Sequence, residues 1–126
     1  MMKLTAWATL AILGVYFWTF AMAGLARGKY KVMAPSMDGP QPFQSAQRVQ
    51  VNTLEQLPLV LAPLWLCAMF LGDVWAAAGG LIWCIGRILY ALGYYRDPAK
   101  REFGFIVGML ASAALVAGSV IGLLLH

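Results

Sequence analysis

Charged side chains are scarce in this sequence. Only 11% of its 126 residues are charged, against about 25% in ordinary soluble domains, whereas 62% are hydrophobic. This composition excludes water as the solvent for most of the surface and is typical of an integral membrane protein. A chain of this length holds about four spans of roughly 20 residues each, which leaves no room for a separate soluble domain.

The sequence has a single histidine and no closely spaced pair of cysteines, and several kinds of catalytic and metal site need these residues. His126 is the single histidine, which excludes the zinc-protease motif and the catalytic triads that contain histidine. Cys67 and Cys84 lie inside apolar runs and have no C-x-x-C spacing. We therefore expect them to be buried small side chains, and we expect no metal site and no redox pair.

Four apolar segments predict an all-α, four-helix transmembrane bundle with one domain over residues 1–126. They cover residues 4–26, 44–71, 74–95 and 102–125. A stretch rich in proline and basic residues predicts a loop after the first segment, whereas Gly72-Asp73 predicts a tight turn after the second. A cleaved signal peptide is the alternative for the first segment, but its apolar core is longer than signal peptides require.

Polar side chains nevertheless enter the second and third segments at helical spacing. Arg48, Asn52 and Glu55 fall within about 60° of one another on a helix. Arg87, followed by Tyr90 and Tyr94, repeats this arrangement on the third segment. A charge in or near lipid costs roughly 2.5 to 3.5 kcal/mol on insertion scales, so these faces need a polar partner.

The partner expected from these residue types is an anion or a zwitterion. An ion pair between Arg87 and Glu55 is the structural alternative, but one acid cannot neutralise several arginines. Guanidinium groups bind carboxylates, an acid and an amide can hold an ammonium or peptide group, and tyrosines add rings with hydroxyls. A small zwitterionic peptide and a lipid phosphate both fit, and periodicity does not separate them.

The order and spacing of these groups resemble the signature of the MAPEG family, the membrane-associated proteins in eicosanoid and glutathione metabolism. The resemblance lies in residues 48–56, in residues 86–94 and in Arg101. It covers roughly half the chain and implies a four-helix bundle assembled as a homotrimer. Within the family, the sequence resembles the bacterial members, the microsomal glutathione transferases and leukotriene C synthase.

The resemblance also implies glutathione as a co-substrate and a role for each matching residue. The expected glutathione-binding residues are Arg48, Asn52, Glu55, Arg87, Tyr90 and Tyr94, with Arg27 and Gln50 supplied by a neighbouring subunit. Gln50 lies about 200° round a helix from Arg48, so the two cannot serve the same pocket.

Arg101 is the expected catalytic residue, because the resemblance assigns the matching arginine to stabilising the glutathione thiolate. The function predicted is that of a membrane-embedded glutathione-dependent transferase or peroxidase acting on hydrophobic electrophiles. The alternative is a non-catalytic lipid- or lipophile-binding scaffold of the same fold, in which Arg101 would be an ordinary cation at the headgroups. Nucleic acid is not an expected partner, since the basic residues do not gather on a soluble face.

The basic residues instead predict a topology. Most lie in or beside the two loops that four spans place on one side of the membrane, namely Arg27, Lys29, Lys31, Arg48, Arg96, Lys100 and Arg101. By the positive-inside rule these loops face the cytoplasm and both termini face away from it, which in a bacterial inner membrane means the periplasm.

This topology can be tested with a reporter fused to the C-terminus. We expect a reporter that is active only in the cytoplasm to stay inactive there, and the same reporter inserted into the loop expected over residues 27–43 to be active. Cytoplasmic activity of the C-terminal fusion would contradict the predicted orientation.

Overall fold

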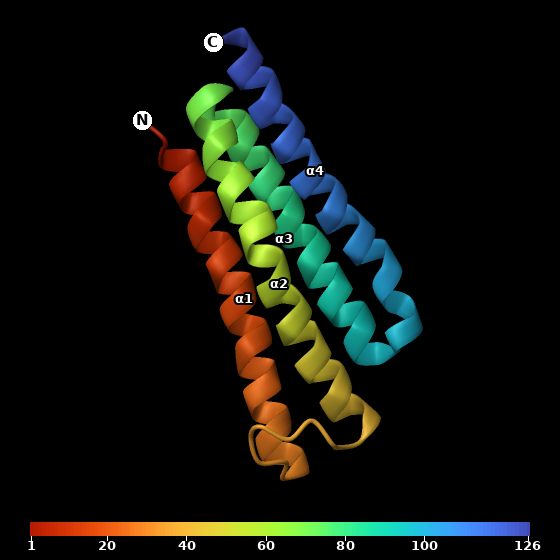
Figure 1. The fold of residues 1–126 in the computed structure, drawn as a ribbon. Coiled ribbons are helices and arrows are strands. Elements are labelled where there is room, and N and C mark those ends of the chain that lie inside the picture. The colour runs from red at the N-terminus through yellow and green to blue at the C-terminus, as the bar shows by residue number, and fades with distance from the viewer.

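The computed structural model describes all residues 1–126 and is built from helices alone. They are α1 (Lys3–Tyr30), α2 (Gln41–Phe70), α3 (Asp73–Arg96), the short 3-10 helix η1 (Pro98–Arg101) and α4 (Glu102–Leu125). The long helices run alternately up and down, and both termini lie at the same end of the bundle (Figure 1). The expected all-α four-helix bundle is confirmed.

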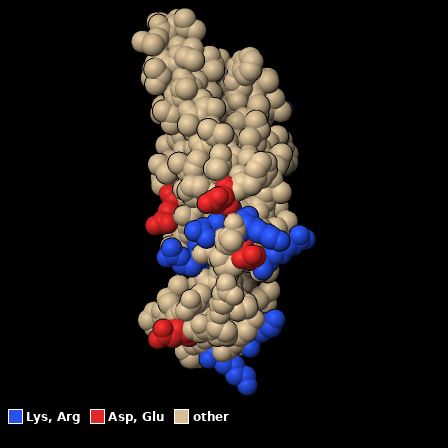
Figure 2. Space-filling model, turned by 90° about the vertical axis from the view of Figure 1, so that its right-hand side faces the viewer, with Lys and Arg blue, Asp and Glu red and all other residues tan.

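The outside of the bundle is suited to lipid. All 4 long helical segments are long and apolar enough to cross a membrane. Large apolar side chains such as Phe17 on α1, Leu81 on α3 and Leu110 on α4 are exposed on the surface. Figure 2 shows that the charged side chains of one face gather in the half away from the termini and leave the other half uncharged. The chain is therefore an integral, multi-pass membrane protein.

The hairpin of α1 and α2 is longer than the apolar segments indicated. Helix α1 continues past residue 26 and ends only where Lys31 adopts a left-handed conformation and donates its N–H to the carbonyl of Arg27. Helix α2 begins at Gln41, before the expected residue 44, because Pro42 lies in its first turn, where a missing N–H breaks no helical hydrogen bond. This hairpin extends beyond the turn between α3 and α4 (Figure 1).

A continuous core joins the four helices in the half of the bundle that contains the termini. Its largest fully buried members are Ile12 of α1, Leu64 of α2, Trp83 of α3 and Leu115 of α4. Because lipid tails are as apolar as these side chains, their close packing, rather than escape from water, holds the helices together.

A carboxylate on α3 closes the start of α1. Asp73 accepts hydrogen bonds from the backbone N–H groups of Leu4 and Thr5, at 3.1 and 2.8 Å, and from the Thr5 hydroxyl at 2.6 Å. The first N–H groups of a helix have no partner within it, so this acid caps α1 from another helix. The turn between α2 and α3 is thereby tied to the beginning of the chain.

Glycines allow α3 and α4 to approach closely where the charged side chains gather. A Cβ atom on Gly86 would lie 2.6 Å from the backbone nitrogen of Gly108, and one on Gly104 would lie 2.6 Å from the carbonyl oxygen of Gly86. At the other end of α4, a Cβ atom on Gly122 would lie 2.6 Å from the backbone of Phe70. The helix backbones therefore touch with no side chain between them.

This packing predicts a large difference between two glycine substitutions. Gly104→Ala should lower the free energy of unfolding by about 1 to 3 kcal/mol, because the new methyl group overlaps the α3 backbone. Gly24→Ala is the matched control, since nothing lies within 4 Å of the position its Cβ would occupy. Thermal unfolding in detergent measures both, and equal stability of the two variants would contradict the close approach of α3 and α4.

Candidate functional site

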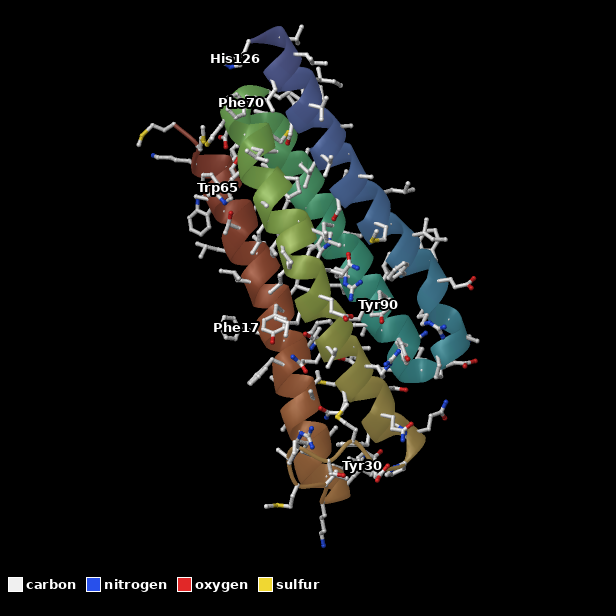
Figure 3. The ribbon with its side chains drawn as sticks, viewed as in Figure 1. Phe17, Tyr30, Trp65, Phe70, Tyr90 and His126 are labelled. Carbon is white, nitrogen blue, oxygen red and sulfur yellow. The ribbon has the colours of Figure 1, made fainter.

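A pocket opens between α2, α3 and α4, near the turn that joins α3 to α4. Its volume is about 640 Å³. The lining comes from one face of α2, the last turns of α3, η1 and the first turn of α4, and consists of Arg48, Val51, Asn52, Glu55, Tyr90, Tyr94, Arg101, Glu102, Phe105 and Ile106. Figure 3 places Tyr90 in this half of the bundle, far from Phe70 and His126 at the other end.

The side chains of α2 reach the pocket because of their helical spacing. Arg48, Asn52 and Glu55 recur at every third or fourth residue, so the predicted polar face exists and lines one cavity. Arg48 and Glu55 are exposed, and Asn52 is half-buried. A guanidinium, an amide and a carboxylate are thus presented in that order along about 10 Å of helix.

Aromatic rings form the opposite wall. Tyr90 and Tyr94 contact each other edge to face, with ring centroids 5.6 Å apart, and the ring of Phe105 lies 6.0 Å from that of Tyr90. The guanidinium of Arg101 lies over the ring of Tyr94, 5.5 Å from its centroid, and donates a hydrogen bond of 2.7 Å to the carbonyl of Pro98. The ring of Tyr94 and the carbonyl of Pro98 thus hold Arg101 at the pocket.

The charges that line the pocket balance. Arg48 and Arg101 contribute two positive charges, and Glu55 and Glu102 contribute two negative charges. The surplus of positive charge expected from the sequence is therefore wrong for the lining of this cavity. A ligand that carries charges of both signs suits this lining better than a simple anion does.

Arg87 is not part of the lining. Its side chain is 1% exposed and lies behind Asn52, where it donates hydrogen bonds of 2.9 Å to Asn52 Oδ1 and to the hydroxyl of Thr53. The ring of Tyr90 faces the guanidinium, with 4.1 Å between its centroid and Cζ. The partners of Arg87 are thus neutral groups. The ion pair between Arg87 and Glu55, the alternative considered from the sequence, is not formed.

Arg27 and Gln50 also lie away from the pocket of their own chain. Arg27 donates a hydrogen bond of 2.8 Å to the carbonyl of Ser36 and lies over the ring of Phe43, so it organises the loop after α1. Gln50 faces α1, where its amide donates to the hydroxyl of Tyr16 at 2.9 Å. Neither side chain is part of the lining of this pocket.

Four lining residues were not singled out from the sequence. Val51 shares the face of Arg48 and Glu55, so helical spacing alone could have found it. Glu102, Phe105 and Ile106 follow Arg101 directly, but only the packing of α4 against α3 turns them toward α2. They add a second acid, besides Glu55, and an apolar wall to the expected site.

Comparison with known sequences agrees with this architecture. Residues 5–121 match the profile of the MAPEG family. An uncharacterized protein of Synechocystis sp. is 44% identical over 121 residues, which are 96% of this chain and 85% of that protein. Leukotriene C4 synthase of Bos taurus is 34% identical over 94% of this chain and 81% of its own length. Microsomal glutathione S-transferase 2 of Homo sapiens is 37% identical over 74% of this chain and 65% of its own length.

The family match spans nearly the whole chain, and two of these relatives are named as glutathione transferase or leukotriene synthase. The resemblance carried by the polar residues of the second and third helices is confirmed. This protein is a member of the MAPEG family.

Proposed function

We propose that this protein is a membrane-embedded glutathione-dependent transferase or peroxidase that acts on hydrophobic electrophiles. The observation that carries the proposal is the gathering of Arg48, Asn52 and Glu55 with Tyr94 and Arg101 in one pocket of about 640 Å³. Glutathione is a zwitterion with two carboxylates and one ammonium, which matches a lining of two arginines and two glutamates. Relatives named as microsomal glutathione S-transferase 2 support the same conclusion.

The polar lining residues of α2 and the tyrosines of α3 have defined parts in this proposal. Arg48 binds a carboxylate of glutathione, Glu55 binds its ammonium group, and Asn52 binds a polar group between them. Tyr90 and Tyr94 form the wall behind the tripeptide. In a homotrimer, Arg27 and Gln50 would reach the pocket of a neighbouring subunit, which accounts for their distance from the pocket of their own chain.

Arg101 is the catalytic residue of the proposal. A free thiol has a pKa of about 8.5, so little of it is thiolate at neutral pH, and a guanidinium next to the sulfur favours the charged form. The thiol proton passes to water, and the thiolate sulfur gives an electron pair to an electrophilic carbon. A C–S bond forms as the bond to the leaving group breaks, and the leaving group carries away that electron pair and takes a proton from water.

A peroxide substrate would use the same thiolate. The sulfur attacks one oxygen of a hydroperoxide, the O–O bond breaks, and the other oxygen leaves as an alcohol after protonation. A second glutathione thiol then displaces water from the oxidised sulfur to give glutathione disulfide. Val51, Phe105 and Ile106 supply an apolar wall beside Arg101 along which a lipophile can enter from the bilayer.

The second candidate is a scaffold that binds a lipid or another lipophile without catalysis. One observation favours it: Arg101 is exposed and already donates a hydrogen bond to the carbonyl of Pro98 in its own turn. An arginine held in this way can serve as a cation at the headgroup level. For either function we propose a bacterial inner membrane, with the basic loops in the cytoplasm and the termini in the periplasm.

Glutathione binding separates these two functions. We expect calorimetry on the detergent-solubilised protein to detect binding of reduced glutathione, together with thermal stabilisation at millimolar concentrations. Glu55→Gln should weaken binding about 10-fold to 100-fold, because it removes a charged partner of the ammonium group. Glu102→Gln removes the other acid of the lining and should weaken binding less, because Glu102 is not proposed to contact the ammonium group. Absence of heat and of stabilisation in the wild type would favour the scaffold.

Thiolate formation tests the role of Arg101. Arg101→Leu should abolish the thiolate absorbance of bound glutathione at neutral pH, and recovering it should require raising the pH toward the value of about 8.5 of a free thiol. Lys100→Leu is the matched control, since this neighbouring cation is exposed and does not line the pocket. Both variants should keep the assembly state of the wild type. Unchanged thiolate absorbance in Arg101→Leu would rule out this assignment.

A further inference from the structure

The guanidinium of Arg87 is buried immediately behind the pocket. It is held from four directions. Asn52 Oδ1 and the Thr53 hydroxyl accept its hydrogen bonds at 2.9 Å each, and the ring of Tyr90 covers its face at 4.1 Å. On the remaining side, α4 passes so closely that a Cβ atom on Gly108 would lie 3.3 Å from Arg87 Cδ.

The orientation of these partners follows from the chemistry of arginine. A guanidinium has only N–H donors and no acceptor, so the group of Asn52 that faces it must be the carbonyl oxygen. The two ends of an asparagine amide are often hard to tell apart, but here the opposite orientation would place N–H groups against N–H groups. The amide of Asn52 is therefore fixed.

The hydroxyl of Thr53 keeps Arg87 in place. It donates its hydrogen to the carbonyl of Val49 at 2.7 Å, one turn earlier in α2, so only its lone pairs remain for Arg87. Thr53 is fully buried. The same nitrogen of Arg87, Nη2, donates to this acceptor and to Asn52, so the contact with Thr53 places the donor that Asn52 meets.

The end of the Asn52 amide that faces the pocket is then the nitrogen. Asn52 lines the pocket and is half-buried, while its oxygen accepts a hydrogen bond from Arg87, which lies outside the lining. Its –NH₂ group, a donor, is the part left for a ligand. A carboxylate or a carbonyl oxygen can bind there, whereas an ammonium group would face a donor and be rejected.

We propose that Arg87 is a positioning residue that acts through Asn52, holding its amide so that the pocket offers a donor at this point and selects a ligand with an acceptor there. The face of α2 then presents donors at Arg48 and Asn52 and an acceptor at Glu55. A zwitterion can bind with its oxygens toward the first two and its ammonium toward the third. This inference rests on the proposed glutathione site, deepens it, and replaces the direct contact expected for Arg87.

A double-mutant cycle tests whether Arg87 acts through Asn52. The dissociation constant of glutathione is measured for the wild type, Asn52→Ala, Arg87→Met and the double variant. Each single variant should weaken binding about tenfold, the effect of one hydrogen bond, and the double variant should bind no more weakly than Asn52→Ala. Weakening of about a hundredfold in the double variant would show independent action and overturn the inference.

Arg87→Lys is the conservative control. Lysine also has donors only, so the oxygen of Asn52 should still face residue 87, and binding should stay closer to that of the wild type than to that of Arg87→Met. If Arg87 had only a packing role, methionine would serve as well as lysine. Equal weakening by the two variants would therefore count against the inference.

Asn52→Asp tests the donor directly. With Arg87 present, the new carboxylate pairs with the guanidinium and shows the pocket only acceptors, so glutathione affinity should fall at least tenfold while thermal stability does not. If the ligand instead places a donor at residue 52, this variant binds as well as the wild type. That result would overturn the inference even if Arg87→Met fails to fold.

A failure of the proposed function can be distinguished from a failure of this inference. A wild-type protein that binds no glutathione would end that proposal, and the Arg87–Asn52 pair would then be judged by stability alone. Asn52→Asp should raise the unfolding temperature when Arg87 is present and lower it in the Arg87→Met background, where the acid has lost its partner. The same change in both backgrounds would overturn the pairing.

Discussion

Hydrocarbon offers no hydrogen-bonding partner, and this constraint decides how the polar residues of the bundle are arranged. Arg87 is the clearest case. It enters the membrane zone as a full charge, and the fold answers with the amide of Asn52, the hydroxyl of Thr53 and the ring of Tyr90. Nε of Arg87 is buried without a hydrogen-bond partner. Because the same Asn52 lines the pocket, its hydrogen bond with the buried arginine also shapes the surface that a ligand meets.

The pocket itself depends on how closely α4 can lie against α3. Gly86 and Gly104 let the two backbones touch, and at the end of α3 a side chain on Gly93 would overlap the backbone of Lys100. The 3-10 turn therefore folds back onto α3 and brings Arg101 over the ring of Tyr94. Without this approach, the guanidinium proposed to stabilise a thiolate would lie apart from the residues of α2 that are proposed to hold the tripeptide.

Charge balance shapes the functional proposal more than the number of arginines does. Arg87 is used inside the wall and Arg27 in the loop, while Glu102 joins Glu55 at the cavity. What remains is a neutral lining with both signs of charge close together, and beside it an apolar wall. Such a site can hold a polar zwitterion and a lipophile side by side, which is the requirement of a conjugation reaction at a membrane.

The sequence by itself determined the four-helix membrane fold, the family and the polar face of α2. Apolar length sets the number of spans, and the period of 3.6 residues places Arg48, Asn52 and Glu55 together whatever surrounds them. It did not determine that Arg87 would lie behind Asn52 or that Glu102 would enter the pocket. Periodicity describes one helix at a time, whereas the rotation of each helix about its axis is set by contacts such as those of Gly86 with Gly108. Only the packed bundle decides which polar face meets a ligand and which supports another residue.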